Sequence, residues 1–111
     1  MLPVCDPSRA DALFDEGVDA LHDRGDRIAT IEAWTRALEI CRAYPDTEAD
    51  QAGLSTHIAD ALIELGRDAE ALAKYEQALD LYRRTKYTAI DQAFCREKIV
   101  ELRARLGRPT G

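Results

Sequence analysis

The sequence has little of what an all-β fold needs. Aromatic residues make up 6% of its 111 residues, and it contains four prolines and six glycines. Strands favour aromatic and β-branched side chains, whereas alanine, leucine, arginine, glutamate and aspartate dominate here. Most of these residues favour helices. Because 46% of the residues are hydrophobic and 32% are charged, the composition indicates a folded, all-α protein.

Cysteine is also scarce. Cys5, Cys41 and Cys95 are an odd number and have no Cys-x-x-Cys spacing, which excludes a disulfide framework and a zinc-binding pattern. Cys41 and Cys95 fall in apolar helical stripes, where a reduced cysteine acts as a small hydrophobic residue. The chain has no apolar run as long as a membrane span and no recognisable targeting segment. We therefore expect a cytoplasmic protein without a membrane partner.

Basic residues are outnumbered, since 15 Lys and Arg face 21 Asp and Glu for a net charge of −6. Neutralising phosphates requires clustered Lys and Arg, so we expect no nucleic-acid partner. The charge is uneven along the chain. Residues 1–66 carry 14 acidic and 5 basic side chains, whereas residues 67–111 carry 7 and 10. Ends of opposite sign can steer a charged partner or a second copy of the chain.

Catalytic motifs are absent from the sequence. It contains no glycine-rich phosphate loop, no Gly-x-Ser-x-Gly and no cysteine–histidine pair at a convincing spacing. We therefore expect a protein that is not an enzyme and needs no cofactor. His22 and His57 could hold a metal together with Asp19 or Asp60. They lack the His-x₃-His spacing, and zinc sites take three or four ligands, so we expect no metal site.

A period of 41 residues is present instead. Gly25, Gly66 and Gly107 follow this spacing, and Asp50-Gln51-Ala52 recurs as Asp91-Gln92-Ala93. Each unit starts with a hydroxyl residue three positions before an aspartate, a pattern that caps helices, and these hydroxyl residues are Ser8, Thr47 and Thr88. We expect each hydroxyl to accept an N–H group at a helix start. The predicted helices span residues 8–24, 26–44, 47–65, 67–85 and 88–106.

The chain is therefore predicted to be one domain over residues 1–111. It divides into a first repeat at 8–46, a second at 47–87 and a capping helix at 88–107. In the last unit, Arg96 and Arg103 replace Ser55 and Leu62 of the second repeat. A polar outer face of this kind is what a terminal repeat needs for solubility.

The segment 59–79 resembles a tetratricopeptide repeat (TPR). The positions that carry the resemblance are Ala59, Gly66, Ala71, Tyr75 and Ala78. In the first repeat Gly25, Trp34 and Ala37 match, whereas Val18 and Thr30 stand where small residues are usual. The period of 41 residues is similar to the long-helix variety of this family. The resemblance implies a right-handed α-α superhelix of two helical hairpins plus a capping helix, whose first helices line a concave groove that binds partners.

Trp34, Tyr75 and Tyr82 follow the helical period, so we expect them in the core between helices. The helical phase places another set on the groove side, and we predict that it binds the partner: Asp15, Glu16, Asp19, His22, Asp23, His57, Asp60, Glu64 and Phe94. We also expect that reversing Asp19 and Asp60 to lysine would disturb no core contact. The alternative is that the acidic residues form only a solvated face.

A cleft of one sign focuses electrostatic potential. The sequence therefore predicts an interaction module or scaffold that binds a basic or amphipathic protein segment, with Phe94 as an anchor. Some members of the resembled family clamp acidic chaperone tails with basic and amide side chains. Asp15 and Asp19 stand at those positions, so this role is not expected. A second hypothesis is a structural protein that forms a homo-oligomer through its oppositely charged ends or its terminal helix.

Overall fold

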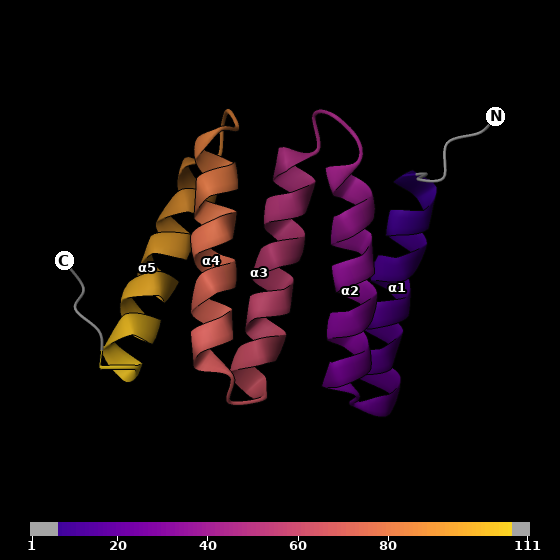
Figure 1. The fold of residues 1–111 in the computed structure, drawn as a ribbon, viewed down its shortest axis with the longest axis horizontal. Helices are drawn as coiled ribbons and strands as arrows, with labels where there is room; N and C mark the ends of the chain where they lie inside the picture. Colours follow the sequence, from indigo (N-terminus) through magenta and orange to yellow (C-terminus); the bar gives the residue numbers. More distant parts are fainter. Residues whose placement is uncertain (1–6, 108–111) are drawn as a thin grey trace.

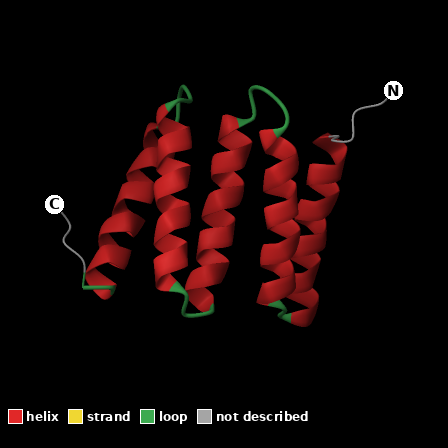
Figure 2. Cartoon of the chain, viewed as in Figure 1, coloured by secondary structure: helices red, strands yellow, loops and turns green. Residues whose placement is uncertain are grey.

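The computed structural model describes residues 7–107, which form five α-helices joined by short loops (Figure 1). The helices lie side by side in chain order, and the loops alternate between the two ends (Figure 2). No strand occurs among the described residues, so the all-α prediction is confirmed. The predicted helix boundaries differ from the observed ones by at most two residues. The helices are α1 (Pro7–Arg24), α2 (Arg27–Arg42), α3 (Glu48–Glu64), α4 (Asp68–Arg83) and α5 (Ala89–Arg105).

The 41-residue register reappears in the turns that end α1, α3 and α5. Gly66 follows α3 with a φ of +75°, a left-handed conformation that glycine adopts without strain. The next residue, Arg67, donates its backbone N–H to the carbonyl of Leu62 at 2.9 Å, which closes the turn. Gly25 and Gly107 also have positive φ values. Each glycine therefore ends a helix, as its place in the repeat predicts.

The prediction that Thr47 and Thr88 cap α3 and α5 by accepting N–H groups is wrong. Neither side chain makes a cap hydrogen bond. The Thr88 hydroxyl donates to the carbonyl of Tyr82 at 2.7 Å and lies 2.9 Å from the carbonyl of Thr85, and it accepts from Gln92 Nε2. Thr47 makes equivalent contacts 41 residues earlier. The hydroxyl prefers the free carbonyls at the end of the preceding helix, and it ties consecutive helices together.

The side-chain cap that does form lies at α2, where Asp26 Oδ1 accepts the backbone N–H of Ala29 at 3.0 Å. Two sequence predictions fall outside the described part of the chain. Cys5 precedes it, and the side chain of Ser8 is not described, although α1 already begins at Pro7.

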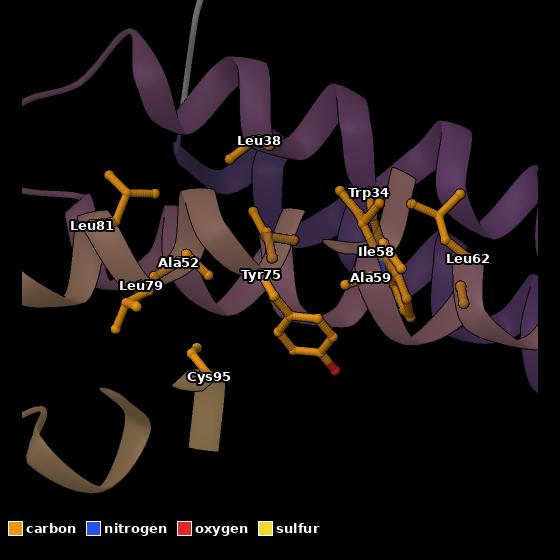
Figure 3. Close-up of a cluster of buried hydrophobic side chains, with 14 of the residues drawn as sticks. Trp34, Leu38, Ala52, Ile58, Ala59, Leu62, Tyr75, Leu79, Leu81 and Cys95 are labelled. Atoms are coloured by element: carbon orange, nitrogen blue, oxygen red, sulfur yellow. The ribbon is translucent and has the colours of Figure 1, made fainter. Parts of the chain in front are cut away.

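Aromatic residues fill the interior between the helices, as the helical period predicts. Trp34 of α2 is 4% exposed, Tyr75 of α4 is fully buried, and Tyr82 of α4 is 8% exposed. Figure 3 shows Trp34 and Tyr75 among aliphatic side chains, with the Tyr75 hydroxyl at the edge of the cluster. Cys95 is also buried, whereas Cys41 is half-buried. Trp34 and Tyr75 therefore play corresponding parts in successive units of the repeat.

The first unit achieves its close helix packing at Gly17. The Trp34 indole lies directly over Gly17, so that a Cβ atom there would meet the ring. Trp34 Nε1 donates to the carbonyl of Phe14 at 3.0 Å, and the buried Thr30 hydroxyl lies 3.0 Å from the carbonyl of Gly17. The missing side chain of Gly17 makes room for Trp34, although Val18 is the residue that the repeat pattern aligns with a small one.

The last unit differs from the second at the two arginines noted in the sequence. Ser55 and Leu62 are buried in α3. Arg96 of α5 is exposed, and Arg103 is partly exposed and pairs with Glu76 of α4 at 3.4 Å. The face of α5 that carries these residues is therefore polar.

Candidate functional site

A set of ring contacts fixes how α1, α2 and α3 meet. The Phe14 ring of α1 stacks on the Trp34 ring of α2 at a centroid distance of 5.5 Å. The His57 ring of α3 lies 5.5 Å from each of them. Phe14 therefore marks the side of α1 that faces α3, and His57 marks the side of α3 that faces α1.

The acidic residues of α1 divide into two groups around Phe14. Each residue of an α-helix advances by about 100°, so Asp11, Asp15 and His22 lie within about 100° of Phe14 and Asp19 lies about 140° away. All four side chains are exposed.

Glu16 and Asp23 belong to the other group. They are also exposed, but they lie about 180° from Phe14, on the side of α1 that is turned away from α3. The sequence set them beside Asp15 and Asp19 because residues four apart share a face. That argument did not include the position of α3, and we leave both residues out of the candidate site.

Asp60 on α3 differs from the sequence expectation. The hydroxyl of the buried Tyr75 donates to the Asp60 carboxylate, so the expectation that Asp60 can be reversed without disturbing a core contact is wrong. Burial, together with this hydrogen bond and the negative charge of Asp60, raises the pKa of Tyr75 above its ordinary value. Asp60 therefore anchors a core residue and also presents its charge at the surface.

Glu64 forms an ion pair with Arg27 of α2. The two side chains are 50% and 40% exposed, and ion pairs at such exposed positions contribute about 0–1 kcal/mol to stability. The pair does neutralise the charge of Glu64 locally. The unpaired negative charge between α1 and α3 therefore lies further along α3, toward its first turn.

Phe94 on α5 is 42% exposed, in line with the expectation that it projects outward. Its ring packs edge-on against Tyr75 at 6.1 Å, and the Lys98 ammonium lies 5.7 Å from the ring centroid. Phe94 therefore belongs to a cluster between α4 and α5, and the described contacts do not connect it with Phe14 or His57.

A pocket of about 400 Å³ opens between α1, the end of α2 and the start of α3. Its wall is partly aromatic, with Phe14, Tyr44 and His57, and it carries the carboxylates Asp11 and Asp50. The remaining described residues that line it are Ala10, Cys41, Thr47, Ala49, Gly53 and Leu54. The described lining contains no lysine or arginine.

The Cys41 thiol reports the charge inside this pocket. Its pKa is raised first by burial and then by the negative charges of Asp50 and Asp11. The two carboxylates come from different helices, and both act on the same thiol. Among the described side chains, neither Asp11 nor Asp50 forms an ion pair. The pocket is therefore an acidic environment.

Sequence reasoning missed Asp11, Cys41, Tyr44 and Asp50. Asp50 could have been found, because it precedes His57 by seven residues and so lies on the same side of α3. Cys41 and Tyr44 could not, because they join the pocket only through the packing of α2 against α3. We use the term acidic surface for the exposed residues that flank the contact of α1 with α3: Asp11, Asp15, Asp19, His22, Asp50, His57 and Asp60.

The structure shows two further properties of residues 7–107. Within this range, no three or more His, Cys, Asp or Glu side chains are grouped so that they could hold a metal ion. No helix in the same range is both long enough and apolar enough to cross a membrane. In comparisons with known proteins, no protein-family model matches the chain and no curated protein matches its sequence.

Proposed function

We propose that the protein is a non-catalytic interaction module that binds a basic segment of a partner protein on the acidic surface between α1 and α3. The observation that carries this proposal is the pocket between these helices, where Asp11 and Asp50 face a partly aromatic wall. Binding sites of this kind combine apolar walls with a few polar groups that set specificity.

The arrangement of the charges supports a role in binding. Asp11, Asp15 and Asp19 follow one another at four-residue intervals along α1. Like charges at this spacing destabilise a helix by a few tenths of a kcal/mol per pair, so folding gives no reason for them. A basic partner would relieve this repulsion.

The proposal extends to the fold. The repeated turns, and the corresponding positions of Trp34 and Tyr75, support a right-handed α-α superhelix of the TPR type, with α5 as a capping helix. In such a superhelix, α1, α3 and α5 would line the concave side, which places the acidic surface where a partner segment would run.

The test is a binding titration of a fluorescently labelled lysine- and arginine-rich peptide, followed by fluorescence anisotropy. We expect the peptide to bind the parent protein and to release as salt is raised, because charged contacts at an exposed surface are screened. The double variant Asp15→Lys/Asp19→Lys should bind at least about tenfold more weakly. Asp60 is left unchanged because it holds Tyr75.

The control is Glu32→Lys/Glu39→Lys, which changes the net charge by the same amount on exposed positions of α2. If binding depends on the acidic surface, this control retains the affinity of the parent. Equal losses in the two double variants would show that only the net charge matters, and that result would contradict the proposal.

A second candidate function is self-assembly, and the exposed apolar side chains of α5 favour it. Ile90 is 86% exposed and Val100 is 50% exposed. Light scattering over a range of concentrations separates the two functions. A monomer at high concentration would rule out the assembly function, whereas an oligomer that dissociates in Ile90→Asp would support it.

A further inference from the structure

We propose that the pocket between α1, α2 and α3 receives one arginine side chain of the bound segment, and so selects arginine over other residues. This inference rests on the proposed function, because it names the residue that a basic partner would anchor in the acidic surface. It uses Asp11, Phe14, Tyr44, Asp50 and His57, and only His57 of these belongs to the set predicted from sequence.

The walls of the pocket suit a flat cation with an apolar stem. Its volume of about 400 Å³ lies at the lower end of the roughly 300–1,000 Å³ that ligand pockets occupy. Phe14, Tyr44 and His57 line it together with Leu54. An arginine stem can pack on apolar walls, and its guanidinium group stacks on aromatic rings.

The carboxylates suit the charge of the same group. Asp11 on α1 and Asp50 on α3 both act on the Cys41 thiol, which places them around one space. A guanidinium group carries five N–H donors in a plane, so it can bond one carboxylate in a bidentate manner and still reach a second. The ion would also relieve the repulsion between the two aspartates.

Two other occupants fit less well. A lysine ammonium group would satisfy a carboxylate, but it is a compact, strongly hydrated charge that makes less use of an aromatic wall. A metal ion would leave the aromatic wall unused, and no group of three potential ligands exists among residues 7–107. The combination of a flat aromatic wall with two carboxylates therefore favours arginine.

The protein carries its own probe of the pocket. Trp34 is the only tryptophan in the chain, and its ring lies 5.5 Å from the rings of Phe14 and His57, which both line the pocket. A side chain that enters between these rings should change the fluorescence of Trp34. A peptide that binds elsewhere on the acidic surface should leave this signal unchanged.

The experiment uses three lysine-rich peptides that differ only at one central residue, which is arginine, lysine or citrulline. Citrulline has the shape of arginine without its charge. We expect the arginine peptide to bind about tenfold more tightly than the citrulline peptide, with the lysine peptide between them. Only the arginine peptide should change the Trp34 fluorescence.

The matching variants are Asp11→Asn and Asp50→Asn, with Asp23→Asn as the control, because Asp23 lies on the far side of α1. Each of the first two should remove most of the preference for arginine over citrulline, while circular dichroism remains that of the parent. The control should keep the preference.

The outcomes separate this inference from the proposed function. Equal binding of all three peptides, or a preference for arginine that survives in both pocket variants, would overturn the arginine pocket and leave the proposed function standing. If none of the three peptides binds, both proposals are wrong.

Discussion

Trp34 lies against Gly17 so closely that a Cβ atom on Gly17 would be 2.6 Å from the Cδ1 atom of the indole. Real side chains do not approach to this distance, so the helix contact exists only because residue 17 is glycine. Trp34 also contacts Phe14 and His57, and through them this close packing positions the wall of the candidate pocket.

Gly17→Ala should destabilise the protein by about 1–2 kcal/mol. Overpacking a core costs about 1–3 kcal/mol, and the better helix propensity of alanine returns about 0.5–1 kcal/mol. The control is Gly53→Ala, because Gly53 is also within a helix and a Cβ atom there would meet nothing within 4 Å. It should stabilise the protein by about 0.5–1 kcal/mol. Urea denaturation measures both, and equal effects would contradict the packing described here.

Ser55 is the next prediction, because its buried hydroxyl has no hydrogen-bond partner among the described residues. Ser55→Ala should therefore leave the free energy of unfolding unchanged or raise it. Thr30→Val is the contrasting variant, since the Thr30 hydroxyl bonds to the carbonyls of Gly17 and Asp26. It should cost about 1 kcal/mol. A large loss of stability in Ser55→Ala would show that this hydroxyl has a partner.

Thr88 should stabilise the junction of α4 and α5 through its hydroxyl. Thr88→Val keeps the shape of the side chain but leaves the carbonyls of Tyr82 and Thr85 without this donor, so we expect a loss of about 1–3 kcal/mol. Thr88→Ser retains the hydroxyl and should lose less. Thermal melts of the two variants measure the difference, and a Thr88→Val protein as stable as Thr88→Ser would refute the role of the hydroxyl.

Cys95 predicts a loss of stability at alkaline pH. Burial and then the negative charge of Asp91 raise the pKa of Cys95 from 9.0 to about 11. A raised pKa in the folded state means that the folded protein holds the proton more tightly, so this contribution is complete below pH 9 and is lost as the pH rises toward 11. Burial also raises the pKa of Tyr75 and Tyr82, which acts in the same direction.

The corresponding measurement is the urea midpoint at a series of pH values between 8 and 11. The parent protein should lose stability above pH 9, and each unit of the Cys95 pKa shift corresponds to about 1.4 kcal/mol. Cys95→Ala should be less stable at neutral pH but should show a shallower decline across this range. A decline of the same slope in the variant would exclude Cys95 as a source of the effect.

Much of the fold could be predicted from the sequence because its signals are local and repeated. Gly25 and Gly66 mark turns, and Trp34 and Tyr75 recur at the helical period, so the helices and the buried aromatic residues follow from one register. The roles of Thr47 and Thr88 could not be predicted, because they depend on where loop carbonyls point. These loops contain positive φ values at Asp46 and Tyr87, which the residue types do not suggest.

The candidate site was harder to predict for a related reason. Helical phase places residues on one helix but does not say what packs beside them. It therefore joined Asp23 to Asp19, and it could not reveal that Asp60 accepts a hydrogen bond from Tyr75. The pocket also depends on three elements, since Asp11, Cys41 and Asp50 come from α1, α2 and α3.

The central claim is that a basic segment binds between α1 and α3, and amide chemical-shift mapping by NMR tests it most directly. The lysine-rich peptide with a central arginine would be titrated into the isotopically labelled protein. The account predicts that the largest shifts occur at residues around the pocket and along the acidic surface, including Asp11, Asp15, Gly53 and His57. Shifts concentrated on the exposed positions of α2 and α4 or on α5, or no shifts at all, would contradict it.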